Sequence, residues 1–300
     1  MKTFVLAIQE GPRWACDNIC SDVINFSQDF GQSLEECKNI WLLSNWQWSA
    51  IPKNYLSQKK VVCTIHHIVE EKFNELEFKS RDEFVDVYHV PCQLTKDSLS
   101  KYTTKTIEVL PYWYNEELWY KQENSKELKD KYNLPKNKLL FGSFQRDTEG
   151  GDLKSPKLEK GPDLFCDIVE NLETKPHIIL TGWRREYILN RLNGKKISYS
   201  YFEMADAKAI NDLYNCLDYY LITSRVEGGP QALLEGGACG TKILSTKVGM
   251  ATQVLSPESI CKDKDDFIRK INLKTRGDSL HEDFEMKKVL PRYFEFFDNL

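Results

Sequence analysis

Short apolar runs recur along the whole chain, and the stretches between them are polar or amphipathic. The runs are rich in Val, Ile, Tyr and Phe, and they are continuously apolar rather than alternating. Continuous apolarity is typical of strands buried on both faces, as in a parallel sheet that is covered by helices. The sequence therefore predicts an α/β fold in which strands and helices alternate.

The runs form two series, which indicates two doubly wound domains. They span residues 3–9, 40–45, 60–68, 85–91 and 106–113 in the first series, and 138–144, 176–183, 197–203, 218–224 and 241–249 in the second. A charged stretch over 115–137 separates them, and 300 residues exceed what one hydrophobic core usually supports. We expect one domain over 1–115, a second over 116–280, and a helical tail over 281–300 that packs back toward the first.

Composition is that of an ordinary globular protein, with 41% hydrophobic and 29% charged residues. A net charge of −4 gives no overall attraction for nucleic acid, which we exclude as a partner. The first apolar run is too short to cross a membrane, and no signal-peptide cleavage site follows it. We expect a cytoplasmic protein, with peripheral contact to the inner face of the membrane.

Cysteine usage and acidic motifs give no sign of a metal site. The nine cysteines are odd in number and scattered, which is typical of buried, reduced thiols. The sequence "DKDD" at 263–266 contains an Asp-x-Asp, but it precedes an amphipathic segment, where acids cap a helix. We therefore expect no metal and no cofactor.

A glycine pair follows the apolar run 218–224, in the sequence "RVEGGPQALLEGG". Glycine tolerates positive φ and lets backbone N–H groups approach a ligand, so Gly228 and Gly229 could form a bend whose amides face an anion. Pro230 fits the first turn of a helix, whose positive dipole end would add to the attraction. Together they predict a seat for a phosphate or diphosphate.

Two glutamates flank this seat. Glu235 would lie inside the helix, where its carboxylate could accept hydrogen bonds from the two hydroxyls of a ribose. Glu227, at the strand end, would face the opposite end of a diphosphate, where a transferred sugar presents hydroxyls. The alternative is that the glycines only turn the chain and that both glutamates are solvated.

The segment 224–255 resembles the signature of the family-4 retaining glycosyltransferases: two acids seven residues apart, then "ACG", an apolar strand and a "VG" turn. The resemblance implies the GT-B architecture, in which two Rossmann-like domains face each other across a cleft. It also implies a nucleoside-diphosphate sugar, linked to UDP or GDP, held mainly by the C-terminal domain.

The resemblance extends to 139–165, where the family has an arginine after a strand and then a Lys-Gly before a helix. It implies that Arg146 and Lys160 neutralise the donor diphosphate, because fixed cations stabilise the charge that the leaving nucleotide gains. Gly182, near the end of the run 176–183, is assigned to donor binding. Within this segment the sequence departs from the family, because the extra residues "DTEGGDLKSPK" separate Arg146 from Lys160.

In the first domain, "VVCTIHHIVEE" resembles the strand that the family ends with a histidine near the sugar. Adjacent strand residues point to opposite faces, so only one of His66 and His67 can face the cleft, and the family pattern favours His66. Gly11 occupies the place of a glycine-containing loop, and Arg13 is a candidate anion contact. The family's Asn-Gly turn is replaced by Tyr112 and Trp113, which either pack in the core or stack on sugar rings.

These observations predict a retaining glycosyltransferase that transfers a sugar from its nucleotide to a glycan or lipid-linked acceptor without a metal. The predicted catalytic residues are His66, Arg146, Lys160 and Glu227, and the predicted donor-binding residues are Gly11, Gly182, Gly228, Gly229, Pro230 and Glu235. The family implies front-face attack, in which the leaving phosphate accepts the acceptor's proton. A nucleotide-sugar epimerase or phosphorylase, and a non-catalytic binding module, are the alternatives.

Overall fold

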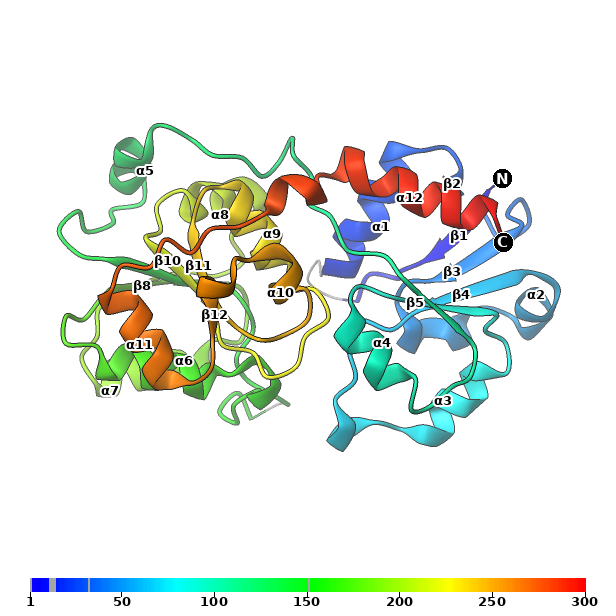
Figure 1. Cartoon of the computed structure of the whole chain (residues 1–300), viewed down its shortest axis with the longest axis horizontal. Coiled ribbons are helices and arrows are strands. Elements are labelled where there is room, and N and C mark those ends of the chain that lie inside the picture. Colours follow the sequence, from blue (N-terminus) through cyan, green and yellow to red (C-terminus); the bar gives the residue numbers. More distant parts are fainter. Residues whose placement is uncertain (1, 11–14, 32, 151) are drawn as a thin grey trace. The chain divides into compact units, whose positions relative to one another are not determined.

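The computed structural model describes residues 2–10, 15–31, 33–150 and 152–300. They divide into two compact units, unit 1 with Met1–Trp113 and Met286–Leu300, and unit 2 with Tyr114–Glu285 (Figure 1). Gly11 and Arg13, to which the sequence analysis assigned ligand contacts, lie outside the described residues.

Unit 1 is built on a six-stranded parallel sheet in the order β2-β1-β3-β4-β5-β6. Its strands are β1 Thr3–Leu6, β2 Phe30–Gly31, β3 Asn39–Leu42, β4 Lys60–Thr64, β5 Val87–Val90 and β6 Thr106–Val109. The strand order changes direction between β1 and β3, the topological switch point of a flavodoxin-like sheet. Nearly all residues of the central strands β3 and β4 are buried, as the continuous apolar runs predict.

The helices of unit 1 are α1 Ala15–Phe26, α2 Lys53–Gln58, α3 Glu75–Asp82, α4 Gln93–Leu99 and α12 Met286–Asp298. The last of these, α12, comes after unit 2 in the sequence yet packs on unit 1. The Tyr293 hydroxyl lies 3.0 Å from Nε2 of the buried His89, and the Phe297 ring lies 5.4 Å from Phe30 and 5.2 Å from Trp41. The segment expected as a helical tail thus completes the core of unit 1.

Unit 2 has a second six-stranded parallel sheet, in the order β12-β11-β10-β7-β8-β9. Its strands are β7 Leu140–Ser143, β8 His177–Thr181, β9 Tyr199–Phe202, β10 Tyr219–Ile222, β11 Lys242–Thr246 and β12 Ile260–Cys261. Read from β9, this is the 3-2-1-4-5-6 order of the Rossmann fold, with its switch point between β7 and β10.

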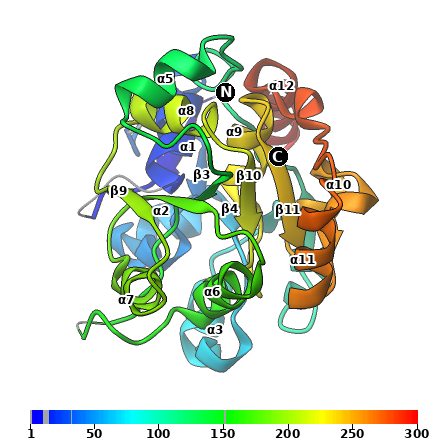
Figure 2. The ribbon, with the colours of Figure 1, turned by 90° about the vertical axis from the view of Figure 1, so that its left-hand side faces the viewer.

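The helices of unit 2 are α5 Ser125–Lys131, α6 Pro162–Asn171, α7 Glu186–Gly194, α8 Ala207–Tyr214, α9 Gln231–Ala238, α10 Ala251–Val254 and α11 Lys264–Asn272. On one face of the sheet, α6, α7 and α11 bury Phe165, Ile188 and Phe267, and α8 and α9 cover the other face (Figure 2). Both faces are therefore dry, as a parallel sheet requires.

The predicted α/β class is confirmed, with two Rossmann-like sheets in place of the two apolar series. The sequence missed β2 and β12, because a two-residue edge strand leaves no recognisable apolar run. The charged stretch 115–137 contains α5, which packs on α8 through the buried Leu128 and Leu213. A buried Asp212 also binds the ammonium of Lys131 at 2.7 Å, so this stretch is part of unit 2.

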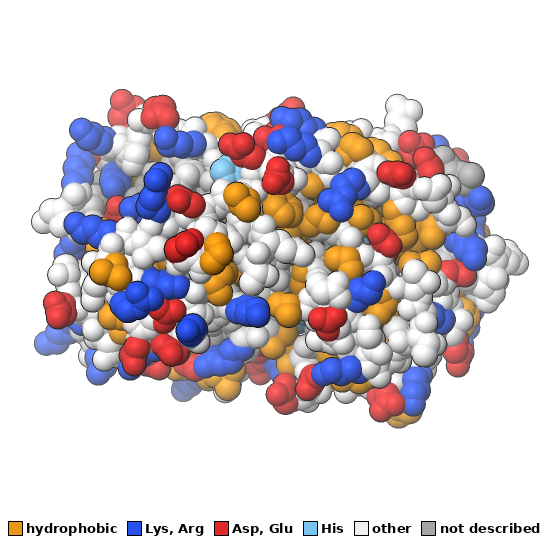
Figure 3. Space-filling model, viewed as in Figure 1, with side chains coloured by type: hydrophobic (Ala, Val, Ile, Leu, Met, Phe, Trp, Pro, Cys, Tyr) orange, Lys and Arg blue, Asp and Glu red, His pale blue; other side chains and the backbone are white. Residues whose placement is uncertain are grey.

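The surface and the cysteines agree with the composition. Acidic and basic side chains are interspersed on the face seen in Figure 3. All nine cysteines are free thiols, and all but Cys16 are buried. Within the described residues, we find no helix with the length and apolarity that crossing a bilayer requires.

The packing of α12 on unit 1 can be tested at its C-terminal end. We expect Phe297→Ala to lower the free energy of unfolding by about 3–5 kcal/mol, because the Phe297 ring is 3% exposed and its removal leaves a cavity. The control is Phe296→Ala, since Phe296 is half-buried and should matter less. Urea unfolding of both variants measures the difference, and equal losses would contradict this role of α12.

Candidate functional site

Two loops meet at the switch point of the unit 2 sheet, where Rossmann-like sheets bind ligands. One loop follows β7 and leads to Lys160 and α6, and the other follows β10 and leads to α9. Gly161 joins them: its φ is +64°, and a Cβ there would lie within 1.9 Å of the Thr223 carbonyl oxygen. The Thr223 hydroxyl also donates a hydrogen bond of 2.8 Å to the Gly161 carbonyl. No other residue type permits this approach without moving the backbone.

The approach brings Lys160 to Glu227. The Lys160 ammonium lies 2.5 Å from the Glu227 carboxylate, and the two side chains are 20% and 8% exposed. The hydroxyl of Ser224 donates to the same carboxylate oxygen at 3.2 Å. An ammonium carries three N–H donors, so this ion pair orients Lys160 and leaves donors for a ligand. The sequence analysis named Lys160 and Glu227 but did not foresee that they bind each other.

The glycine pair differs from the expected geometry. Neither Gly228 nor Gly229 has a positive φ, and Pro230 is the cap that precedes α9 rather than its first residue. The left-handed residue is Gly249 of the "VG" turn, at φ +50°, where a Cβ would lie 2.1 Å from the Gly228 carbonyl oxygen. The close packing of this loop therefore requires a glycine at position 249.

The amides of this loop remain available all the same. No described group accepts a hydrogen bond from the N–H of Gly228 or Gly229. Together with the first N–H groups of α9, they form a set of donors at the positive end of a helix dipole. This is the arrangement that binds phosphate groups in proteins.

Glu235 lies on α9, one turn beyond its start. The hydroxyl of the buried Tyr214 lies 3.4 Å from its carboxylate, which holds the partly buried side chain in place. Tyr214 was not among the predicted residues, because nothing in its sequence context distinguishes it from a core tyrosine. Glu235 is not part of the Lys160–Glu227 pair. It can therefore contact a different part of a ligand than that pair does.

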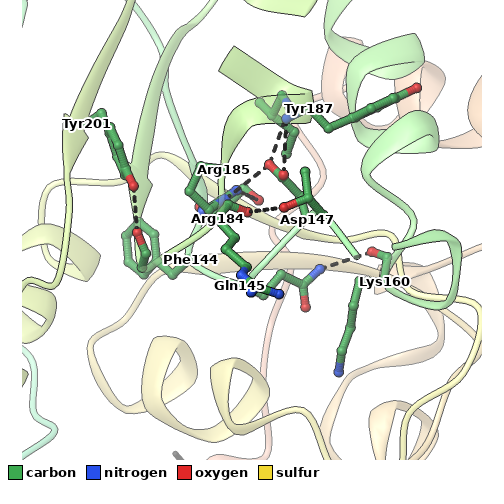
Figure 4. Close-up of polar contacts among 12 residues, drawn as sticks. Phe144, Gln145, Asp147, Lys160, Arg184, Arg185, Tyr187 and Tyr201 are labelled. Carbon is green, nitrogen blue, oxygen red and sulfur yellow. Dashed lines mark hydrogen bonds and ion pairs between the residues drawn. The ribbon is translucent and has the colours of Figure 1, made fainter. Parts of the chain in front are cut away.

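Arg146 and Gly182 follow the ends of β7 and β8. Arg146 is partly buried, and it forms no ion pair or hydrogen bond with the described residues. Gly182 has φ +84°, and its carbonyl accepts a hydrogen bond of 2.9 Å from Tyr201. Next to Arg146, the Gln145 side-chain amide donates 3.0 Å to the Lys160 carbonyl (Figure 4). The beginning of the loop after β7, which carries Arg146, is therefore in direct contact with its end at Lys160.

A buried ion pair holds the loop after β7, and the sequence analysis missed it. Arg185 and Asp147 are 0% and 1% exposed, and Nε of Arg185 lies 3.2 Å from Oδ2 of Asp147 (Figure 4). Arg185 also donates to the carbonyls of Ser143 and Thr181, the last residues of β7 and β8, both at 2.5 Å. Asp147 accepts from the backbone at the start of α7. The pair locks the loop of Arg146 onto the sheet.

In unit 1, His66 follows β4, and both of its ring nitrogens are engaged. Nε2 donates to the Leu43 carbonyl at 2.8 Å, and Nδ1 lies 2.5 Å from the Tyr112 hydroxyl, which donates to it. Burial lowers the pKa of His66 to about 4, so the ring is neutral at physiological pH. Tyr112 and Trp113 are 4% and 2% exposed, so they pack in the core and are not free to stack on sugars.

The Asp-x-Asp near the end of unit 2 caps a helix. The Asp263 carboxylate accepts a hydrogen bond of 2.9 Å from the Asp266 amide at the start of α11. Asp265 points outward, with a side chain that is 87% exposed. These acids are fully accounted for by helix capping and solvation.

Removing one member of the buried pair should destabilise unit 2. We expect Asp147→Ala to lower the free energy of unfolding by about 3–5 kcal/mol, because Arg185 would remain as a buried, unpaired charge. The matched control is Asp167→Ala, which breaks an ion pair of Arg191 in which the acid is 47% exposed; we expect a loss of about 1 kcal/mol or less. Denaturant unfolding measures both, and similar losses would contradict the assigned role of Arg185.

The His66 tautomer can be read directly. We expect nitrogen NMR of the imidazole to show a proton on Nε2, and the ring to stay neutral from pH 7.5 down to about pH 5, because burial opposes protonation. In urea the same ring should titrate near 6.5. Protonation of the folded protein's His66 near pH 6.5 would contradict the hydrogen bonds described above.

Comparison with known proteins agrees with this architecture. Residues 151–273 match the model of the family "Glycosyl transferases group 1". No curated protein matches the sequence. The family match covers the glycine loop, α9 and Lys160, the segment on which the resemblance to glycosyltransferases was based.

Solved structures resemble the whole chain at low identity. HepE of Anabaena, in complex with UDP-glucose, is 14% identical with a TM-score of 0.78, and each chain covers 100% of the other. Sucrose-phosphate synthase of Thermosynechococcus elongatus is 14% identical with a TM-score of 0.70, over 88% of this chain and 73% of that one.

A glycosyltransferase of Rickettsia africae is 14% identical with a TM-score of 0.63, over 98% of this chain and 84% of that one. At such identities the likeness establishes the fold. The chain therefore has the GT-B fold, and its residues 151–273 are similar to the glycosyl transferases group 1 family.

Proposed function

We propose that the protein is a retaining glycosyltransferase that uses a nucleoside-diphosphate sugar and no metal. The observation that carries the proposal is the meeting of Lys160 with the Gly228–Gly229 loop at the switch point of the unit 2 sheet. An ammonium, free main-chain amides and a helix start converge there. That combination suits a diphosphate better than it suits a neutral ligand.

Each group has a place along such a donor. The diphosphate would lie on the amides of Gly228 and Gly229 and bind the remaining donors of Lys160. Glu235, held by Tyr214, would accept hydrogen bonds from the ribose hydroxyls. Glu227, already bound to Lys160, would face the transferred sugar and keep the ammonium aimed at the leaving group.

The same groups would favour bond cleavage. When the sugar–phosphate bond breaks, its electron pair stays on the phosphate oxygen, and the leaving nucleotide gains a negative charge. Lys160 and Arg146 would bind that charge more strongly in the transition state than in the ground state. Fixed cations would thus supply what a metal ion supplies in other transferases.

The remaining features of the reaction follow from the resemblance to family-4 enzymes. Retention would proceed by front-face attack, and the acceptor would be a glycan or a lipid-linked glycan. His66 would contribute a neutral imidazole, and a sugar hydroxyl would reach that ring only by replacing Leu43 or Tyr112 as its partner. UDP is a reasonable nucleotide to test first, since HepE binds UDP-glucose in the matching structure.

Donor binding gives the first test. Among UDP-, GDP-, ADP- and TDP-sugars, we expect one class to raise the melting temperature, and Glu235→Ala to weaken its binding at least tenfold by removing a charged ribose acceptor. The control is Glu173→Ala, an exposed glutamate of unit 2, which should bind like wild type. Titration calorimetry measures the affinities, and unchanged binding by Glu235→Ala would refute the ribose assignment.

Product analysis separates the proposal from its rivals. With the preferred donor and a panel of glycan acceptors, we expect release of the nucleoside diphosphate and a product that keeps the donor's anomeric configuration. An isomerised nucleotide sugar would indicate an epimerase, and sugar 1-phosphate formed with added phosphate would indicate a phosphorylase. Binding of the nucleotide without turnover of any donor would support a non-catalytic module.

A further inference from the structure

The described residues that separate Arg146 from Lys160, 147–150 and 152–159, include the two sides of a hairpin at the carboxyl edge of the unit 2 sheet. Thr148 and Pro156 form an antiparallel bridge, and the Lys157 amide donates 2.7 Å to the Asp147 carbonyl at its base. Asp147 is the partner of the buried Arg185, so the base of the hairpin is fixed to the sheet. The hairpin therefore places Lys157 at a defined position beside the candidate diphosphate site.

Lys157 is more enclosed than a surface lysine. Its side chain is 22% exposed, similar to the 20% of Lys160, and its closest acid is Glu159 at 3.7 Å. Burial lowers the pKa of Lys157, and the positive charges of Lys160 and Arg146 lower it further. The cations of this edge are thus close enough to repel one another.

The acids nearby do not balance these cations. Lys160 is paired with Glu227 and Lys157 with Glu159, while Arg146 forms no ion pair with the described residues. A further arginine of the same edge, Arg225, is already bound by both carboxylate oxygens of Asp163. Arg146 is thus left without an ion-pair partner beside Lys157 and Lys160, and an anion bound at this edge would reduce the repulsion among the three cations.

We infer that Lys157 is a third cation of the nucleotide site and binds the diphosphate of the donor and of the released nucleoside diphosphate. The inference rests on the proposed function and adds a residue that the extra hairpin supplies. The free nucleoside diphosphate carries about one more negative charge than its sugar ester, because its terminal phosphate is no longer esterified. Lys157 should therefore bind the leaving nucleotide more strongly than the intact donor.

A purely structural role for Lys157 predicts something different. If the lysine only paired with Glu159, its removal would destabilise the protein without ligand and would affect all ligands alike. If it is a phosphate-binding cation, its removal relieves repulsion in the free protein and weakens only ligands that carry phosphate. The two roles therefore have opposite effects on the melting temperature of the free protein.

The test compares Lys157→Gln with Lys154→Gln, which removes the same charge from an exposed position of the same hairpin. Affinities for UDP, UDP-glucose and uridine are measured by calorimetry. If wild type binds GDP more tightly than UDP, the corresponding guanosine compounds replace these three ligands. We expect Lys157→Gln to weaken diphosphate binding about three- to tenfold, sugar ester binding less, and nucleoside binding not at all. Its melting temperature without ligand should be equal to or above that of wild type.

Three results would overturn the inference: wild-type affinity in Lys157→Gln, the same loss in Lys154→Gln, or a lowered melting temperature with equal losses for diphosphate and nucleoside. Failure of the proposed function has a different signature. In that case the wild-type protein itself would bind neither UDP nor GDP. The Lys160→Gln variant would likewise bind neither nucleotide.

Discussion

The close approach of Gly161 to Thr223 is the contact on which the candidate site depends. A left-handed glycine and a carbonyl lie against each other where a Cβ would be 1.9 Å from oxygen. The contact joins the loop after β7 to the loop after β10 and thereby sets Lys160 against Glu227. The switch point of a parallel sheet only brings two loops to one edge, and it is this contact that makes them one site.

The second constraint is electrostatic. Arg185 and Asp147 are both buried, and each neutralises the charge of the other. Their role is to fix the loop that carries Arg146. The partly buried cations Lys157, Lys160 and Arg146 outnumber the acids that pair with them in the described residues, as is common where a protein binds a polyanion. Two arginines thus serve this edge in different ways: the buried Arg185 before α7 positions the backbone, and the partly buried Arg146 after β7 is available to a ligand.

The sequence was sufficient to predict all strands except the two-residue edge strands β2 and β12, because runs such as 60–68 and 218–224 are continuously apolar, as is typical of a parallel sheet with both faces buried. It was also sufficient to locate Lys160, Glu227 and Glu235 on one edge. It could not show the ion pair of Lys160 with Glu227, since that depends on a contact between residues 67 positions apart.

Other features could not be found from sequence for different reasons. Buried arginines are rare, so Arg185 resembled a surface charge. The hydrogen bonds of His66 involve a backbone carbonyl, which leaves no mark on the side-chain pattern. The glycine pair was interpreted from its tolerance of positive φ, whereas the left-handed glycine of this region is Gly249, which packs against the Gly228 carbonyl.

The central claim is that a diphosphate binds at the switch point of unit 2, and a crystal structure of the protein with UDP or GDP tests it most directly. We predict that diphosphate oxygens lie about 3 Å from the Lys160 ammonium and from the amides of Gly228 and Gly229. A nucleotide bound elsewhere, with the Lys160–Glu227 pair and these amides left without contact to it, would contradict the account.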